Sequence, residues 1–346
     1  MINIAIIGSG YWGINYVRVF SETPTSKVAL VCDLSEERLR VVRARHQLIN
    51  TSQNWEEVLT NKWIDAVVIA TPTSSHFTLA QQCLQAGKHV LIEKPLASNL
   101  GECERLVETA AQADRVLMVG HTFLYNPGVH KVKQIVERAD FGKIYYLHSA
   151  RTNMGPIRHD VNAIWDLAAH DVAIFNYLLD TQPQWVSAVG ARALGNDRED
   201  VGFITLGYPQ GTIANIRVSW VDANKVRELV AVGGQRRVVF DDLNNMERVR
   251  IFEKGVAPAE LEADSFGEFQ LLVRDGDIVS PHVEASEPLR NLCQHFLDCV
   301  EQGKAPMTDG RNGLEVVRVL TAIDQSMARN GAPVEVQTVT ALPEAA

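Results

Sequence analysis

Positive charge and long apolar runs are both scarce in this sequence of 346 residues. Lysine and arginine together number 33 against 42 aspartates and glutamates, which gives a formal net charge of −9. Because nucleic-acid binding needs a basic surface, we exclude nucleic acid as a general partner. The sequence contains no stretch of about 18 apolar residues, and its first residues lack the pattern of a secretion signal. We therefore expect a cytoplasmic protein with no membrane association.

Cysteine is also rare, and no two cysteines have the C-x-x-C spacing of a redox or zinc motif. There are five, an odd number, which excludes a disulfide framework and favours reduced, buried thiols without a bound metal. Repeats and low-complexity segments are missing. The length and the 46% hydrophobic content are typical of a globular protein of about two domains. The cysteines are Cys32, Cys83, Cys103, Cys293 and Cys299.

The most informative stretch of the chain lies between residues 2 and 13. Apolar residues typical of a buried strand lead into the run G-S-G-Y-W-G, and a helical pattern follows. In such a unit Gly8 permits the turn, Gly10 lets the backbone approach a pyrophosphate, and Gly13 allows close packing of helix on strand. The helix N-terminus, which carries Tyr11 and Trp12, offers N–H donors to the phosphates. A glycine turn in an unrelated α/β protein is the alternative.

An acidic residue at the end of the next strand strengthens the dinucleotide interpretation. The run K-V-A-L-V-C-D ends at Asp33, 20 residues beyond Gly13, where a carboxylate would accept hydrogen bonds from the adenine ribose. Its charge would repel the 2′-phosphate of NADP, so we predict NAD as the cofactor. Arg38, in the second turn of the following helix, could instead reach such a phosphate, and NADP stays open as the second choice.

Strand and helix patterns alternate over the first 121 residues, which predicts a dinucleotide-binding domain with a doubly wound parallel sheet of the Rossmann type over residues 1–121. Two polar loops follow apolar strands of this sheet, at 64–70 and 89–92, and ligands of α/β sheets bind at such strand ends. We therefore add both loops to the cofactor site. Their predicted contact residues are Thr71, Pro72, His76, Glu93 and Lys94.

Beyond His121 the pattern changes. Strand-like runs at 143–151, 185–192, 201–207, 212–220, 227–232 and 237–240 follow one another with turns between most of them, and helical stretches appear at 288–302 and 312–330. This order predicts an α+β domain over residues 122–346, with an open, mostly antiparallel sheet and helices on one side. We expect this domain to bind the substrate.

Three groups of residues are candidates for a role in catalysis or substrate binding. Lys94 stands between an apolar strand and Pro95, where an ammonium could hold or donate a proton; a surface lysine at a strand end is the alternative. Asp166 and His170 are four residues apart, so on a helix they would share a face, and the carboxylate would favour the protonated imidazole. An ordinary polar pair on a helix would look the same.

The loop that precedes this pair, residues 153–162, is rich in hydrogen-bonding groups and either contacts a polyhydroxyl or phosphorylated substrate or is simply solvated. Arg158 is the side chain that we expect to bind a charged group. The substrate-binding residues that we predict are Lys94, Tyr125, Arg151, Asn153, Arg158, Asp166 and His170.

Taken together, the glycine run, Thr71-Pro72 with His76, Glu93-Lys94-Pro95 and the spaced pair Asp166 and His170 resemble the Gfo/Idh/MocA family of oxidoreductases. The resemblance covers essentially the whole chain, and Glu-Lys-Pro is its most specific motif. It implies that Lys94, Asp166 and His170 are the catalytic residues, with Lys94 polarising the reacting oxygen, His170 exchanging its proton and Asp166 tuning the pair. It also implies a homo-oligomer, a dimer or tetramer, joined through the sheet of the second domain. Many relatives have Asp-x-Gly-x-His, whereas Ala168 stands at the glycine position here.

Within this family, the phrases I-R-H-D-V-N-A-I-W-D-L-A-A-H-D and S-W-V-D-A-N-K-V-R-E-L-V-A-V-G-G resemble members that act on nucleotide sugars in amino-sugar biosynthesis. The implied activity is NAD-dependent oxidation of a sugar hydroxyl to a ketone, at C3 of UDP-N-acetylglucosamine, for a later aminotransferase. An inositol or free-sugar dehydrogenase, an NADPH-dependent keto-sugar reductase and a non-catalytic dinucleotide sensor are the alternatives. Retention of the three catalytic residues argues against a sensor.

Overall fold

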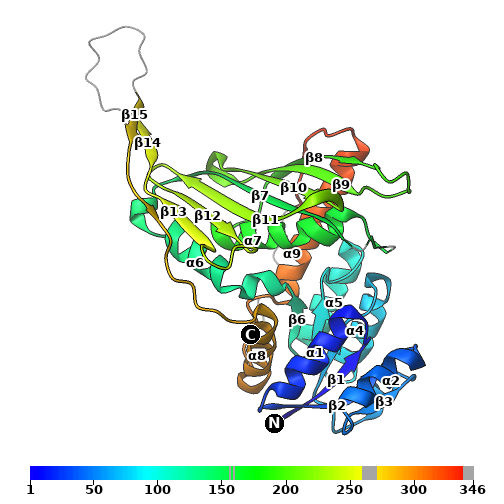
Figure 1. Ribbon diagram of the computed structural model, residues 1–346. Coiled ribbons are helices and arrows are strands. Elements are labelled where there is room, and N and C mark those ends of the chain that lie inside the picture. The colour runs from blue at the N-terminus through cyan, green and yellow to red at the C-terminus, as the bar shows by residue number, and fades with distance from the viewer. Residues whose placement is uncertain (156, 159, 259–270, 338–346) are drawn as a thin grey trace, which may run out of the picture.

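The chain forms two sheets with helices packed against each, and Figure 1 shows the first sheet below the second. The computed structural model describes residues 1–155, 157, 158, 160–258 and 271–337. None of the described helices is both long and apolar enough to span a membrane. Within the same residues, no group of three or more His, Cys, Asp or Glu side chains is arranged to hold a metal ion.

The first sheet has six parallel strands in the order β3-β2-β1-β4-β5-β6, the arrangement of a Rossmann fold. This confirms the predicted doubly wound sheet. The strands read as apolar runs because helices cover both faces. They are β1 (Ile2–Ile7), β2 (Ser26–Cys32), β3 (Asn50–Ser52), β4 (Ala66–Ile69), β5 (His89–Glu93) and β6 (Leu117–Gly120).

Alternate residues of β1 belong to different cores. Ile4 and Ile6 pack in one core, while Ala5 and Ile7 pack in another, as the period of two of a strand requires. In the first domain, α1 (Tyr11–Glu22) and α2 (Glu36–Arg45) contribute to the first of these cores, and α3 (Glu57–Thr60), α4 (His76–Gln85) and α5 (Leu100–Ala113) contribute to the second.

The second sheet has nine strands in the order β16-β13-β12-β11-β7-β10-β9-β8-β17. Neighbouring strands are antiparallel except for β7 and β10, which are parallel. The sheet is therefore mostly antiparallel, as the sequence predicted. Its strands are β7 (Ile144–Met154), β8 (Trp185–Ala191), β9 (Val201–Gly207), β10 (Ile213–Ser219), β11 (Val221–Gly233), β12 (Arg237–Asp241), β13 (Val249–Phe252), β16 (Ile278–Val279) and β17 (Val334–Glu335). A two-stranded hairpin, β14 (Gly255–Pro258) with β15 (Leu271–Arg274), extends away from it (Figure 1).

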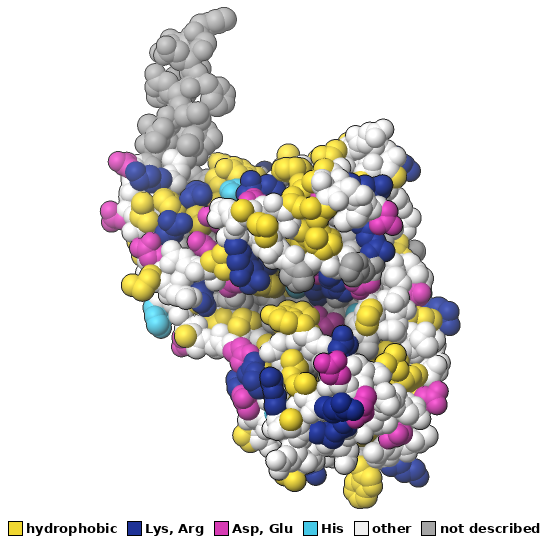
Figure 2. All heavy atoms as spheres, turned by 45° about the vertical axis from the view of Figure 1, so that its right-hand side comes forward, with side chains coloured by type: hydrophobic (Ala, Val, Ile, Leu, Met, Phe, Trp, Pro, Cys, Tyr) yellow, Lys and Arg dark blue, Asp and Glu magenta, His cyan; other side chains and the backbone are white. Residues whose placement is uncertain are grey.

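Among the described residues, helices cover one face of the second sheet, the face that is turned toward the first sheet (Figure 1). They are α6 (Pro127–Val136), α7 (Ala169–Leu179) and α9 (Gly310–Ala328), with the one-turn π-helix η4 (Ile164–Ala168) ahead of α7. The opposite face exposes apolar side chains among polar ones (Figure 2). Val189, Phe203 and Ile213, on three adjacent strands, are each about half exposed.

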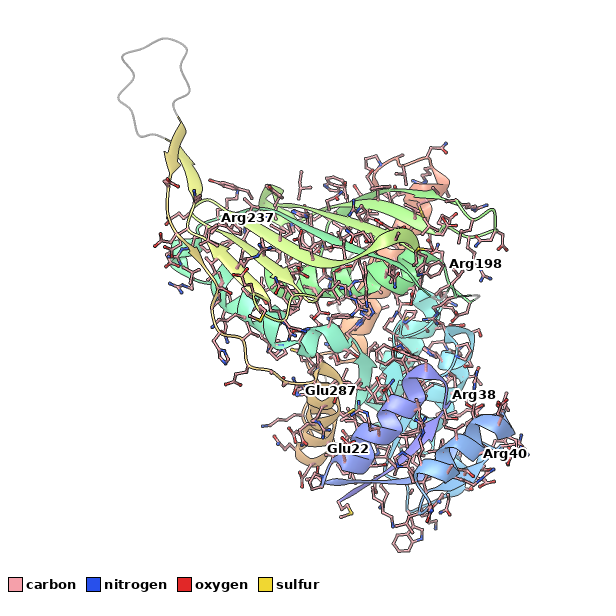
Figure 3. The ribbon with its side chains drawn as sticks, viewed as in Figure 1. Glu22, Arg38, Arg40, Arg198, Arg237 and Glu287 are labelled. Atoms are coloured by element: carbon pink, nitrogen blue, oxygen red, sulfur yellow. The ribbon has the colours of Figure 1, made fainter. Side chains whose placement is uncertain are left out.

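The C-terminal helices join the two halves of the molecule. Helix α8 (Pro288–Gln302) packs against α1, and Glu22 and Glu287, which Figure 3 labels, form ion pairs with Arg290 and Arg18 across that contact. Helix α9 packs against α5 as well as β8. Residues after 288 therefore contribute to the core of the first sheet, which the division of the sequence at residue 121 did not anticipate.

Candidate active site

The glycine-rich turn after β1 contains three glycines. Two of them have no room for a side chain, and the third faces open space. Gly8 has a φ of +91°, and a Cβ there would lie 2.6 Å from the carbonyl oxygen of Ala70. A Cβ on Gly13 would lie 1.8 Å from the carbonyl oxygen of Gly8. A Cβ on Gly10 would meet nothing closer than Arg38 Nη1 at 3.9 Å. The free space at Gly10, at the N-terminus of α1, fits a pyrophosphate bound to the helix N–H groups.

The Asp33 carboxylate is tied to this turn. It accepts hydrogen bonds from Ser9 N at 2.7 Å, from Ser9 Oγ at 3.0 Å and from Ser35 N at 2.8 Å. Burial opposes ionisation, but the N–H groups of Ser35 and Ser9 hold the pKa of Asp33 below its usual value. Arg38 Nη1 lies 3.6 Å from the carboxylate, and its exposed side chain lies on α2 (Figure 3). Both residues line a depression of about 500 Å³ that has room for an adenosine.

Tyr11 and Trp12 occupy the first turn of α1, where Tyr11 is largely exposed and the two rings contact each other edge to face. Both stand next to the open space at Gly10. Their roles as cofactor contacts stay predictions.

The loop after β4 lies beside the glycine turn, since the methyl carbon of Thr71 lies 2.9 Å from the position of a Cβ on Gly8. Pro72 is exposed at the same strand end. His76, by contrast, is fully buried, and its ring nitrogens lie 2.9 Å from the carbonyl oxygen of Pro95 and 3.0 Å from that of Thr71. The ring nitrogens that a cofactor contact would need are therefore occupied, and His76 instead connects the two loops.

Glu93, also predicted as a cofactor contact, faces the inside of the first domain. It accepts a hydrogen bond from Tyr16 Oη at 2.7 Å and one from Lys94 N at 3.3 Å. Burial raises the pKa of Glu93. Its position supports the strand end from which Lys94 projects.

Lys94 and Asp166 join the two domains. Lys94 Nζ donates to Asp166 Oδ1 at 2.9 Å and to the main-chain oxygen of Asp166 at 2.7 Å. Arg158 Nη1 donates to the same carboxylate oxygen at 3.2 Å, and the rest of its guanidinium binds Asp160. Burial would raise the pKa of Asp166, but Lys94 and then Arg158 hold it below its usual value. Asp166 is therefore an ionised carboxylate that fixes the ammonium of Lys94.

His170 lies in the same region, at the start of α7, but it is not the partner of Asp166. Its ring contacts Phe123 with centroids 4.8 Å apart, and its buried Nδ1 has no hydrogen-bond partner among the described residues. Burial, with the charges of Lys94 and Arg151, lowers the pKa of His170 well below its usual value. The expected carboxylate–imidazole pair is thus wrong. The reason is the competition for the carboxylate: Asp166, in η4, is held by Lys94 and Arg158, which come from other segments of the chain.

Three further predicted substrate contacts have other partners or lie beside the pair. Tyr125 is buried, and its hydroxyl lies 3.2 Å from Thr308 Oγ1. Its described hydrogen bonds involve neither Lys94 nor Asp166. Arg151 forms two hydrogen bonds of 3.1 Å with Asp171 and lies over the Phe123 ring. Asn153, near the end of β7, has a buried Oδ1 without a partner among the described residues. Arg151 therefore shapes the surroundings of His170, and Asn153 alone of these three has an atom free for a ligand.

One residue of this region was not predicted at all. His121 follows β6 directly, and because Glu93 pairs with Gly120, it leaves the sheet beside Lys94. It is 1% exposed, and neither ring nitrogen has a partner among the described residues. Burial and then the charge of Lys94 lower the pKa of His121 to about 3. A polar residue placed immediately after an apolar strand was the signal in the sequence that could have identified it.

Comparisons with known proteins agree with this architecture. A family model described as an oxidoreductase family with an NAD-binding Rossmann fold matches residues 2–121, and the Gfo/Idh/MocA C-terminal domain matches residues 129–239. UDP-N-acetylglucosamine 3-dehydrogenase of Acidithiobacillus ferrooxidans is 31% identical over 72% of this chain and 76% of its own length. Inositol 2-dehydrogenase 2 of Saccharopolyspora erythraea is 29% identical over 63% of this chain and 66% of its own length.

Among solved structures, the UDP-N-acetylglucosamine 3-dehydrogenase GnnA of Acidithiobacillus ferrooxidans aligns with a TM-score of 0.77 and 27% identity, covering 94% of this chain and 98% of that one. The glycine turn, the strand order and the second sheet thus have counterparts in known relatives. The chain belongs to the Gfo/Idh/MocA family of oxidoreductases, with an NAD-binding Rossmann domain at its N-terminus.

Proposed function

We propose that this chain oxidises a sugar hydroxyl to a ketone with NAD, and that this hydroxyl is the one on C3 of UDP-N-acetylglucosamine. The observation that carries the reaction type is the arrangement of Lys94, fixed by Asp166, near the neutral His170 at the ligand-binding edge of the Rossmann sheet. The choice of sugar is supported by the similarity to a UDP-N-acetylglucosamine 3-dehydrogenase, which is 31% identical over most of both chains.

In this mechanism two hydrogen bonds of the Lys94 ammonium go to Asp166, and a third N–H is left for the substrate oxygen. The hydroxyl proton passes to His170, which is neutral at pH 7 and has a free ring nitrogen. The C–H electron pair leaves as hydride and the C–O bond becomes a carbonyl. NAD supplies the carbon that accepts the hydride.

An inositol is the second candidate substrate, because an inositol dehydrogenase is nearly as similar in sequence. Both substrates carry at least one hydroxyl on a carbon next to the oxidised one, so the same three side chains suit either. An NADPH-dependent reduction of a keto sugar would run the same chemistry in reverse. A sensor without catalysis would not require an ion pair between the domains at this place.

The test is NADH formation at 340 nm with purified protein, NAD and a panel of UDP-sugars, inositols and free sugars. Parallel wells contain an aminotransferase that removes 3-keto sugars, because the ketone is expected to accumulate poorly. Signal with UDP-N-acetylglucosamine alone supports the full proposal. Signal with an inositol or a free sugar keeps the reaction and discards the nucleotide sugar. If no sugar of the panel gives NADH while the protein still binds NADH, the proposed dehydrogenase activity is contradicted.

A variant separates catalysis from binding. His170→Ala is expected to lower turnover by about 100-fold or more and to leave NADH binding unchanged, since His170 belongs to the second domain. His282→Ala is the control, because His282 is an exposed residue of the same domain, between β16 and α8, and has no part in the arrangement. Equal effects of the two substitutions would remove His170 from proton transfer.

We propose also that the open face of the second sheet joins copies of this chain into a dimer or tetramer. The support is its row of exposed apolar side chains, Val189, Phe203 and Ile213, on the face without helices. Light scattering during gel filtration tests this: Phe203→Glu is expected to yield monomers, whereas Leu48→Glu, at an exposed site on the first domain, leaves the assembly unchanged. A monomeric parent protein would refute it.

A further inference from the structure

We propose that His121 binds the substrate directly, as a neutral imidazole that contacts a hydroxyl next to the one that is oxidised. The inference rests on the proposed function, because it assigns a contact within the same site. It starts from the position of the residue. Pairing of Glu93 with Gly120 makes Lys94 and His121 the first residues beyond two neighbouring parallel strands, β5 and β6. Both side chains therefore start from the edge of the sheet where α/β folds bind ligands.

The hydrogen bonding of His121 differs from that of histidines that serve the fold. His76 has a carbonyl oxygen within 3.0 Å of each ring nitrogen, and His89 Nδ1 accepts a hydrogen bond from Val116 N. Within the described part of the chain, His121 has a partner at neither nitrogen although it is almost completely buried. Buried polar atoms are nearly always paired, so two free nitrogens on one ring indicate that a ligand supplies the partners.

The surroundings identify the kind of ligand. The ammonium of Lys94 is near enough to lower the pKa of both His121 and His170, so the three side chains share one site. Burial keeps the imidazole neutral at physiological pH, and a neutral imidazole has one N–H donor and one nitrogen acceptor. A hydroxyl both donates and accepts. A polyhydroxylated ring held by Lys94 therefore offers His121 the partners that the protein does not.

Two substitutions test this contact. His121→Phe keeps the ring and removes both polar atoms, whereas His121→Asn keeps one donor and one acceptor. We expect His121→Phe to raise the KM for the sugar by about tenfold or more, with unchanged NADH affinity and unchanged or higher Tm. His121→Asn is expected to recover most of the loss. His282→Phe, at an exposed position between β16 and α8, is the control for replacing a histidine.

The kinetic outcomes separate the roles. A KM within twofold of the parent in His121→Phe overturns the proposal, and so does a parallel loss of NADH affinity, which would place His121 against the cofactor. A fall in Tm for both variants without a change in KM would show a structural histidine, which also overturns it.

A binding experiment keeps this inference separate from the reaction. In protein with isotope-labelled histidine, the imidazole signal of His121 is assigned by its absence in His121→Phe. It is then followed as each sugar of the panel is added to the NADH-bound protein. A shift on addition of a sugar, in a protein that oxidises no sugar of the panel, would support the contact while contradicting the proposed function. No shift with any sugar would overturn the contact, even if the parent protein is an active dehydrogenase.

Discussion

Lys94 Nζ donates hydrogen bonds to two oxygens of one residue, the main-chain oxygen of Asp166 at 2.7 Å and its Oδ1 at 2.9 Å. Lys94 follows a strand of the first sheet, and Asp166 lies 72 residues later in η4, which packs with the second. The ammonium is therefore placed by both domains at once. An oxygen bound by its remaining N–H would be fixed relative to the cofactor domain and the substrate domain together.

Replacing Asp166 by Asn tests what the charge of this pair contributes. The main-chain oxygen remains as an acceptor for Lys94, but the carboxylate that fixes the ammonium is lost. We expect kcat to fall by about 100-fold, with a smaller change in KM. Steady-state kinetics on the substrate identified by the panel gives both constants.

Asp160→Asn is the matched control, because Asp160 also binds Arg158 but has no hydrogen bond to Lys94 among the described contacts. A kcat for Asp166→Asn equal to that of the control would show that the ion pair is not needed for turnover.

The sequence was sufficient for the first domain because its signals are local. Gly8, Gly13 and Asp33 stand at fixed offsets around one turn, and apolar strands alternate with helices. The structure adds a reason for Asp33 that spacing alone does not contain, since its carboxylate binds Ser9 and Ser35. The motif therefore specifies the turn and, with it, the position of the proposed cofactor site.

Two glycines of this turn are expected to respond differently to the same substitution. Gly13→Ala places a methyl group against the carbonyl oxygen of Gly8, so we expect a loss of about 3 kcal/mol or more in the free energy of unfolding. Gly10→Ala meets open space and has an ordinary φ of −71°. It should leave stability within about 1 kcal/mol of the parent while weakening NADH binding by about tenfold.

Thermal unfolding and NADH fluorescence titration measure the two effects. Unchanged NADH affinity in a folded Gly10→Ala protein would mean that the pyrophosphate does not approach this glycine.

The proposed catalytic arrangement was harder to predict than the proposed cofactor site, because its contacts join distant segments. Spacing placed Asp166 beside His170, but Lys94 and Arg158 approach the carboxylate and are its partners instead. The position of His121 directly after an apolar strand was the one signal for it in the sequence, whereas the lack of a partner for either ring nitrogen is a property of the fold. Neither a π-helical turn nor an unpartnered buried nitrogen has a signature in a single sequence.

Asp33 is expected to determine the choice between NAD and NADP. Asp33→Ala removes a carboxylate that would repel a 2′-phosphate, and Arg38, 3.6 Å away in the parent protein, is then free to bind one. We expect the preference for NAD, measured as kcat/KM with NAD divided by kcat/KM with NADP, to fall by about tenfold. NAD affinity should also fall, because Ser9 loses its acceptor. In the double variant with Arg38→Ala, any gain in NADP use should disappear. An unchanged ratio in Asp33→Ala would remove Asp33 from this role.

Asp324 on α9 gives the protein a pH-dependent stability that can be removed without touching the site. Its carboxylate accepts a hydrogen bond from Trp165 Nε1 at 2.8 Å and has no cationic partner among the described ion pairs. Burial raises the pKa of Asp324 from 3.8 to about 6. An acid with a raised pKa binds its proton more tightly in the folded state. Its contribution to stability is therefore complete below pH 3.8 and is lost as the pH rises through about 6.

Asp324→Asn keeps an acceptor for Trp165 and removes the ionisation. At pH 8 we expect the variant to be more stable than the parent by about 1–3 kcal/mol, with the difference shrinking as the pH falls from 6 to 4. Urea unfolding at several pH values measures it, and Asp197→Asn, in an exposed loop, is the control. The fluorescence of Trp165 supplies a second reading, since a titration near pH 6 in the parent should be missing from the variant. A stability difference that is constant with pH would show that burial does not hold the proton on Asp324. Turnover should be unchanged, because Trp165 keeps its hydrogen bond and η4 therefore continues to present Asp166 to Lys94.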